Sequence, residues 1–280
     1  MKRAKVGGKP LRDFPGRLVL LGAGKMGSAM LDGWLARGLD PRKLIVLEPQ
    51  PAKDVKALRR RGVALNPQGK LQNASAIVIA VKPQSAPEAL PTLRPFVGKS
   101  TLAVSIMAGR TLGFLQNALP PGTAVVRAMP NTPAAIGRGI TVATPNRKVS
   151  ARQRKLAGDL LAAIGTVEWI SDEALMDAVT AVSGSGPAYV FLLAEALAQA
   201  GVAAGLPVAL AQKLARETVA GSGELLHRSA LDAAVLRENV TSPGGTTAAA
   251  LSVLMGQDGL PQLMRAAVAA ATARSRELAG

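Results

Sequence analysis

Continuous apolar runs, separated by stretches with helical spacing, dominate the first half of the 280-residue chain. They are apolar at successive positions rather than at every second one, which is typical of parallel strands covered on both faces. Strands are predicted at 18–22, 44–48, 76–81, 101–106 and 123–129, with further strands near 140–143 and 165–169. Helices are predicted at 26–38, 52–61, 84–94 and 111–118. The alternation predicts an α/β fold with a Rossmann-like, doubly wound parallel sheet.

Beyond residue 172 the pattern changes to helices rich in alanine and leucine, separated by Gly, Pro and Ser. These helices are apolar around much of their circumference, so we expect some faces to pack against a second copy of the chain. Three parts are therefore predicted. Residues 1–17 are a basic arm expected to be disordered, 18–171 a dinucleotide-binding domain, and 172–280 an all-α, helical-bundle domain for dimerisation and substrate binding.

A glycine motif lies between the first predicted strand and the first predicted helix. Gly22, Gly24 and Gly27 have G-x-G-x-x-G spacing. In this motif the first glycine allows a tight turn, the second lets a pyrophosphate approach the backbone, and the third lets helix and strand pack closely. The phosphates would lie at the positive end of the helix dipole. The position of the motif predicts binding of NADH or NADPH.

An acidic residue, Glu48, follows the second predicted strand about 20 residues after the glycines. A carboxylate there usually accepts hydrogen bonds from the adenosine ribose and repels a 2′-phosphate, which favours NADH over NADPH. Lys43 and Lys53 lie nearby and would moderate this preference. The alternative interpretation is that Glu48 is a solvated residue before a turn.

Composition narrows the chemistry further. The chain has no cysteine and one histidine, His227, so we expect no thiolate nucleophile, no disulfide and no metal site; we expect His227 to be a solvated helix residue. The net charge of +16 suggests anionic ligands, but only 2% of residues are aromatic and no nucleic-acid motif is present. We therefore expect no nucleic-acid partner. We also expect no membrane span and a soluble, cytoplasmic protein.

Residues that normally donate protons in carbonyl reduction are scarce. The chain has one tyrosine, Tyr189, which we expect to be a core residue, and no lysine between positions 156 and 212. Reduction of a carbonyl generates an alkoxide that needs a proton donor. An imine nitrogen can arrive already protonated or take a proton from water or a hydroxyl. The composition therefore permits an imine reductase.

Six segments together resemble one enzyme family. "GAGKMGSAM", "AVKPQ", "SIMAG", "VRAMPNTPAAIGRGIT", "DAVTAVSGSGPAYVFLLAEAL" and "NVTSPGGTTAAAL" run in the same order as in pyrroline-5-carboxylate reductases, over nearly the whole chain from residue 18. The resemblance implies reduction of L-1-pyrroline-5-carboxylate to L-proline by NADPH or NADH, the final step of proline biosynthesis. It also implies an interlocked homodimer, with a ring of dimers as the larger alternative.

The resemblance also implies where the two ligands bind. With the glycine motif and Glu48, it predicts these cofactor-binding residues: Gly22, Ala23, Gly24, Lys25, Met26, Gly27, Glu48, Pro49, Ala80, Val81, Lys82, Pro83, Met107, Ala108 and Asn239. It places the substrate at an interface between two subunits, around Glu173, Ser242, Gly244, Gly245, Thr246 and Thr247. Thr247 matches the hydroxyl proposed to bond the ring nitrogen and donate the proton.

Alternative interpretations remain for these segments. Glu173 also fits a helix N-terminal acid, and Ser242 or Thr246 a simple helix N-cap. "MPNTP" at 129–133 is expected near the cofactor or substrate, and "SGSGPAY" at 183–189 is expected to permit tight helix packing. Another two-domain reductase of imines or hydroxy acids, or a catalytically silent nucleotide- or nucleic-acid-binding protein, are the competing functions.

Overall fold

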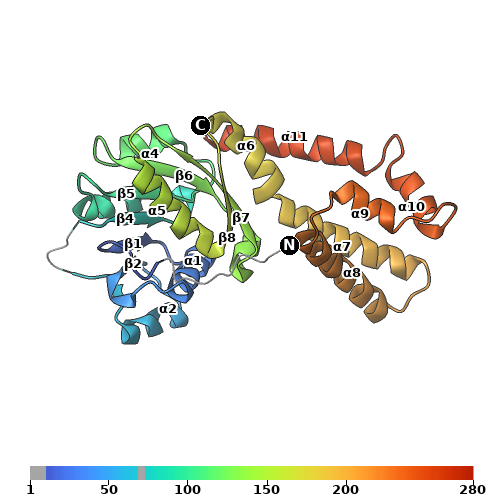
Figure 1. Cartoon of the computed structure of the whole chain (residues 1–280), viewed down its shortest axis with the longest axis horizontal. Coiled ribbons are helices and arrows are strands. Elements are labelled where there is room, and N and C mark those ends of the chain that lie inside the picture. Colours follow the sequence, from blue (N-terminus) through green and yellow to red (C-terminus); the bar gives the residue numbers. More distant parts are fainter. Residues whose placement is uncertain (1–10, 69–72, 280) are drawn as a thin grey trace. The chain divides into compact units, whose positions relative to one another are not determined.

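The computed structural model describes residues 11–68 and 73–279 and divides the chain into two units (Figure 1). The first unit runs to Gly184 and includes Ala273–Gly280 at the other end of the chain, and the second is Ser185–Thr272. The first ten residues of the predicted arm lie outside the described part.

The first unit contains an eight-stranded sheet with the order β3-β2-β1-β4-β5-β6-β7-β8. All neighbouring strands are parallel except β6 and β7, which are antiparallel. The strands are β1 (Leu18–Leu21), β2 (Leu44–Leu47), β3 (Ala64–Leu65), β4 (Ala76–Ile79), β5 (Leu102–Ser105), β6 (Ala124–Met129), β7 (Gly139–Pro145) and β8 (Gly165–Trp169). The predicted Rossmann-like sheet is therefore confirmed. The two-residue β3 was not predicted.

Side chains on alternate positions of the central strands enter two separate cores, because successive residues of a strand point to opposite faces. Leu18 and Leu20 pack in one core, whereas Val19 and Leu21 pack in the other. The first core is covered by α1 (Lys25–Ala36) and α5 (Ala151–Leu161), and the second by α3 (Ala86–Ala89), the 3-10 turn Leu90–Phe96 and α4 (Leu112–Ala118). This double covering explains the continuous apolar runs. A short helix, α2 (Lys53–Ala57), follows β2.

The end of the predicted arm is part of the core rather than disordered. Leu11 and Phe14 are 1% and 2% exposed and pack in the same core as α1. The backbone is also attached, because Leu11 N donates to the Arg37 carbonyl and Lys43 Nζ donates to the Phe14 carbonyl. The expectation of disorder was wrong for residues 11–17. It was based on the many cations of the segment and gave too little weight to the two apolar residues Leu11 and Phe14.

The first unit continues past the predicted boundary at residue 172. A 3-10 turn (Glu173–Leu175), α6 (Met176–Val179) and a π-helical turn (Thr180–Gly184) all belong to it, and Met176 and Ala181 are buried there. Gly184 permits close packing, since a Cβ at this position would lie 2.6 Å from Met129 Cε. The observed boundary lies later than the predicted one, because side chains after the last strand, such as Met176 and Ala181, still pack in the first unit.

The chain also returns to the first unit at its end. The last helix, α11, is Leu260–Ala279, and its final turns belong to the first unit. There Ser275 Oγ donates to Asp177 Oδ1 at 2.7 Å. The Leu278 carbonyl oxygen lies 3.3 Å from the position that a Cβ on Gly109 would occupy. The C-terminal turn therefore packs beside the loop that follows β5.

The second unit consists of helices with almost no buried residues. Its helices are α7 (Gly186–Ala203), α8 (Val208–Arg228), α9 (Ala233–Asn239), α10 (Thr246–Leu254) and the larger part of α11. Within 185–272 the buried residues are three alanines, Ala198, Ala211 and Ala215. Large apolar side chains are instead exposed, among them Phe191 at 67%. Three alanines cannot supply a hydrophobic core for a unit of this size.

The sequence led us to expect no stretch apolar enough to span a membrane, but the described residues contain one candidate. The helical stretch Glu173–Ala203 is long and apolar enough to cross a membrane by length and composition, with a mean hydropathy of 1.3. Only 6% of the 18-residue apolar window within this stretch is buried within the chain. Alanines on both sides of the run "VFLL" at 190–193 extend the apolar stretch to this length.

We predict that Phe14→Ala lowers the free energy of unfolding of the first unit by about 3–5 kcal/mol, because it removes a buried aromatic ring. Urea unfolding followed by tryptophan fluorescence measures this, since both tryptophans, Trp34 and Trp169, lie in that unit. The exposed neighbour provides the control: Arg12→Ala is expected to change stability by less than about 0.5 kcal/mol. Equal stability of Phe14→Ala and wild type would contradict the assignment of Phe14 to the core.

Candidate active site

The glycine motif forms a tight turn between β1 and α1. Gly22 has a φ of 91°, in the left-handed region that favours glycine, and its N–H donates to the Leu47 carbonyl. A Cβ on Gly27 would collide with the carbonyl oxygen of Gly22. Gly24 is the N-cap residue of α1, no side chain caps the helix, and a Cβ there would meet open space. The turn thus leaves the helix N-terminus accessible to an anion.

The loops after β1, β2, β4 and β5 lie along one edge of the sheet. Ala80 N donates to the Leu21 carbonyl at 2.7 Å, and Ile106 N donates to the Ile79 carbonyl at 3.0 Å, so the strands end in register. The Arg110 guanidinium donates to the Pro83 carbonyl and ties the last two loops together. The structure therefore brings together the predicted cofactor residues of the first unit: Gly22 to Gly27, Glu48, Pro49, Ala80 to Pro83, Met107 and Ala108.

Glu48 contacts the glycine turn directly. Ala23 N donates to Glu48 Oε2 at 2.8 Å, and Gln50 N donates to Glu48 Oε1 at 3.0 Å. The residue is half-buried. The alternative of a merely solvated Glu48 is therefore wrong, because both carboxylate oxygens have backbone partners and one of these partners belongs to the glycine motif.

Glu173 forms a partly buried ion pair. Its Oε1 accepts a hydrogen bond from Arg127 Nη1 at 2.7 Å and another from Leu112 N at 2.8 Å. The Arg127 side chain is 6% exposed and that of Glu173 is 29% exposed. Glu173 thus accepts from the first N–H of α4, whose N-cap residue is Thr111. In its own turn the capping side chain is that of Asp172, which accepts from Ala174 N. Glu173 does lie in the first turn of the helical segment that it begins, as the alternative interpretation has it, but its hydrogen bonds go to Arg127 and α4.

In the second unit, the predicted substrate residues cluster between α9 and α10. Asn239 ends α9, and Ser242, Gly244, Gly245, Thr246 and Thr247 follow within eight residues. Gly244 has a φ of 69°, which a glycine adopts readily. The N-cap residue of α10 is Gly245, and no side chain caps the helix. The alternative in which Ser242 or Thr246 is the cap was wrong, so the N–H groups that open α10 remain available to a carboxylate.

Other residues singled out in the sequence have simpler positions. "MPNTP" starts at the last residue of β6 and continues at the same sheet edge as the predicted cofactor residues, and Asn131 Oδ1 accepts from Ile140 N there. His227 is exposed, as expected. Tyr189 is half-buried.

Two residues beside the predicted site were missed. Arg127 is an arginine within the apolar strand "AVVRAM", and a charge in such a place signals a buried partner. Asn66, which follows β3, exchanges two hydrogen bonds with the backbone of Glu48. The sequence signal for Asn66 was weak, because β3, the strand before it, has only two residues.

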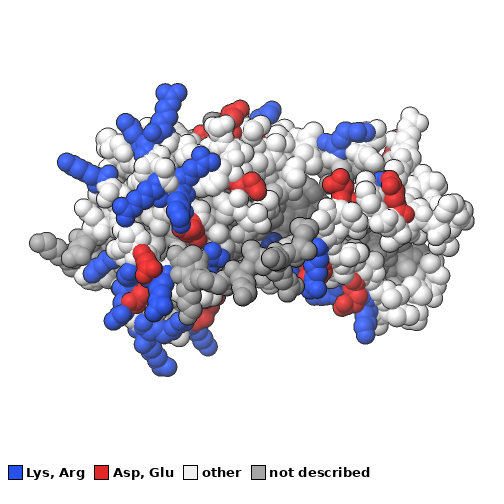
Figure 2. Space-filling model, in the orientation of Figure 1, with Lys and Arg blue, Asp and Glu red and all other residues white. Residues whose placement is uncertain are grey.

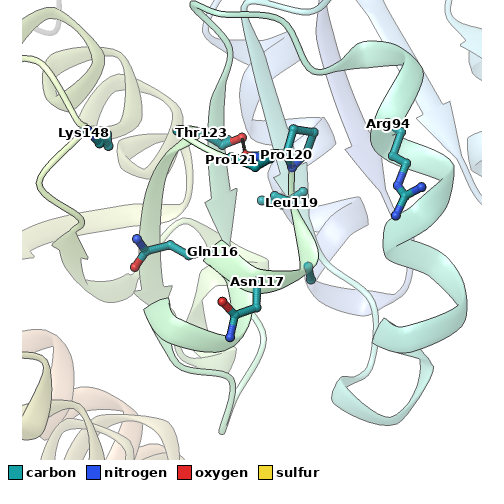
Figure 3. Close-up of a pocket in the computed structure, with 10 residues that line it drawn as sticks. Arg94, Gln116, Asn117, Leu119, Pro120, Pro121, Thr123 and Lys148 are labelled. Carbon is teal, nitrogen blue, oxygen red and sulfur yellow. Dashed lines mark hydrogen bonds between the residues drawn. The ribbon is translucent and has the colours of Figure 1, made fainter.

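A surface hollow of about 700 Å³ lies at the opposite edge of the sheet, where β6 begins (Figure 3). It is lined by the end of α4, the loop Leu119–Thr123, Arg94 and Lys148. None of the predicted site residues lines it. In parallel α/β sheets ligands bind at the carboxyl ends of the strands, so the hollow and the candidate active site are separate features.

Positive charge gathers on the first unit. Figure 2 shows Lys and Arg side chains over this unit on the face in view, with fewer Asp and Glu among them. The whole chain has 34 basic and 18 acidic residues. Such a surface attracts small anions, including nucleotides and carboxylates.

Comparison with known proteins matches two parts of the chain to family models. Residues 173–278 match the family model "Pyrroline-5-carboxylate reductase dimerisation", and residues 17–109 match "NADP oxidoreductase coenzyme F420-dependent". A pyrroline-5-carboxylate reductase of Synechocystis sp. is 41% identical over 265 residues, which cover 94% of this chain and 98% of the relative.

Solved structures agree with these matches. A pyrroline-5-carboxylate reductase of Coxiella burnetii has a TM-score of 0.86 and 32% identity, covering 95% of this chain and 99% of the other. The pyrroline carboxylate reductase of Plasmodium falciparum, solved with NADP bound, has a TM-score of 0.79 and 31% identity over the same shares. With both units matched and relatives aligned over nearly the full length, the chain belongs to the pyrroline-5-carboxylate reductase family.

Proposed function

We propose that the chain reduces L-1-pyrroline-5-carboxylate to L-proline with NADH or NADPH, as the final step of proline biosynthesis. The observation that carries this proposal is the pair of uncapped helix N-termini. One begins α1 after the glycine turn, and the other begins α10 after the Gly244–Gly245 pair. The first suits a pyrophosphate and the second a small carboxylate.

The first unit supplies the cofactor site. The open space at Gly24 and the free N–H groups of α1 accommodate the pyrophosphate, and Glu48 accepts the ribose hydroxyls. The loops 80–83 and 106–108 flank the nicotinamide. When bound, the nicotinamide supplies the hydride for the imine carbon. Because the Glu48 carboxylate repels a 2′-phosphate, we propose a preference for NADH.

The second unit supplies the substrate loop. The N–H groups that open α10 hold the substrate carboxylate, and the flexibility of Gly244 and Gly245 lets the backbone approach it. Ser242 and Thr246 complete the loop. Asn239, at the end of α9, contacts the cofactor. Glu173 reaches the substrate region with its carboxylate held by Arg127.

Thr247 is the proposed catalytic residue. It lies in the first turn of α10 and is half-buried. Its hydroxyl donates a hydrogen bond to the ring nitrogen and provides the proton as the amine forms, and water then returns a proton to the threonine oxygen. A hydroxyl is a weak acid, but the nitrogen becomes strongly basic as the imine carbon accepts hydride, so no stronger acid is required.

The active form is proposed to be a cytoplasmic homodimer that forms through the second unit. The apolar side chains exposed on α7 and α8 have no core of their own to enter, and residues 173–278 match a dimerisation domain. A second copy of the chain would cover the apolar window at Glu173–Ala203. Interfaces between permanently associated subunits have this apolar character.

A paired assay tests the function. The purified protein is incubated with pyrroline-5-carboxylate and either NADH or NADPH, and nucleotide oxidation and proline formation are measured. We expect proline with both nucleotides and a higher kcat/KM with NADH. Turnover of a hydroxy acid or of other imines without proline formation would favour a different reductase. Salt-dependent DNA binding without any turnover would favour a catalytically silent protein.

We predict that Thr247→Val lowers kcat by about 100-fold, since it removes the hydroxyl that bonds the reacting nitrogen. Thr247→Ser keeps a hydroxyl and is expected to retain most of the activity. Ser252→Ala, an exposed change on the same helix, is the matched control and should leave kcat unchanged. An unchanged kcat in Thr247→Val, with the fold intact by circular dichroism, would exclude the role.

We also predict that Phe191→Asp dissociates the dimer, because it places a charge in the apolar surface of α7. Sedimentation velocity should show a lower mass than that of wild type at the same concentration. Lys99→Asp, at an exposed position of the first unit, also introduces an aspartate and should leave the mass unchanged. A wild-type mass for Phe191→Asp would show that this face is not the subunit interface.

A further inference from the structure

The carboxylate of Glu48 is immobilised against the phosphate-binding turn. Ala23 N donates to Oε2 at 2.8 Å and Gln50 N to Oε1 at 3.0 Å. Each carboxylate oxygen can accept two hydrogen bonds, so both retain capacity for the hydroxyls of a ribose. Immobilisation matters for selectivity, because a carboxylate that rotates freely would turn away from a 2′-phosphate.

Asn66 holds the backbone of Glu48 at two points. Glu48 N donates to Asn66 Oδ1 at 2.9 Å, and Asn66 Nδ2 donates to the Glu48 carbonyl at 2.8 Å. Both residues are half-buried. The side-chain amide therefore continues, by one residue, the pairing of β2 with β3, in which Val46 lies opposite Leu65. The main chain of Asn66 also participates, since its N–H donates to the Val46 carbonyl at 2.8 Å.

The backbone of Asn66 is unusual in a way that this arrangement explains. Its φ is 48°, and among the described residues it is the one non-glycine residue with a positive φ. Asparagine tolerates the left-handed region better than most residues, and local strain of this kind is often retained at functional sites. A glycine would allow the same turn but could not hold Glu48. An asparagine satisfies both requirements.

We propose that Asn66 is a positioning residue that sets the cofactor selectivity of the enzyme. By fixing the main chain of Glu48, it keeps the carboxylate at the phosphate-binding turn, where the carboxylate accepts the ribose hydroxyls of NADH and repels the 2′-phosphate of NADPH. Asn66 itself does not need to touch the cofactor. This inference rests on the proposed function, and specifically on Glu48 facing the adenosine ribose.

The test is a double-mutant cycle on the ratio of kcat/KM for NADH to kcat/KM for NADPH. Asn66→Gly keeps the left-handed turn and removes the two side-chain hydrogen bonds, so it is expected to fold and to lower the ratio about three- to tenfold. Glu48→Ser should lower the ratio further. In the Glu48→Ser background, Asn66→Gly should have no additional effect, because a positioning residue acts through its partner.

Two measurements separate positioning from general damage. The KM for pyrroline-5-carboxylate should not change in Asn66→Gly. Asn117→Gly, the same substitution at an exposed position at the end of α4, should leave the cofactor ratio at the wild-type value. A ratio that Glu48→Ser changes and Asn66→Gly does not would overturn the inference. So would an equal effect of Asn66→Gly in both backgrounds, since Asn66 would then act without Glu48.

A measurement without turnover keeps this inference distinct from the proposed function. The dissociation constants of NADH and NADPH are obtained from the fluorescence of the bound nucleotides, for wild type and for the same three variants. The preference for NADH in these constants should fall in Asn66→Gly, fall further in Glu48→Ser, and show no additional change when both substitutions are combined. If both nucleotides bind but no proline forms, the proposed reaction fails while the role of Asn66 is still decided by the binding ratio.

Discussion

The parallel pairing of β1 with β2 on one side and with β4 on the other is the constraint on which the candidate cofactor site depends. Parallel strands that start in register also end at the same edge of the sheet. Gly22, Glu48 and Ala80 therefore follow their strands at neighbouring positions although they are far apart in sequence. A shift of β2 by a single residue would turn Glu48 to the other face of the sheet, away from the glycine turn.

The two units are stabilised in different ways. The first buries large side chains in two cores on either side of its sheet, including Trp34 and Phe96. The second buries three alanines and exposes its leucines and valines. The apolar surface that the second unit leaves exposed in one chain can stabilise a dimer when a second copy covers it. In the proposed dimer, folding and association of this unit are coupled, so its stability is expected to depend on protein concentration.

Most of the first unit could be predicted from the sequence because its signals are local. A run such as "AIVIAV" is buried on both faces wherever it lies, and the glycine motif specifies its own turn. The misses depended on distant contacts. Phe14 is buried by α1, and the Glu173 side chain reaches Arg127 and α4, which no local pattern indicates. Asn66 was missed because the strand before it, β3, has two residues, too few to show an apolar pattern.

The return of the chain to its first unit has a practical meaning for work with this protein. The Leu278 carbonyl packs beside Gly109, in the loop after β5 that carries Met107 and Ala108. A purification tag or fluorescent protein fused directly after α11 would therefore start next to a loop that we propose contacts the cofactor. The affinity for the cofactor measured on such a fusion would include the effect of the tag on this loop. A removable tag avoids this effect.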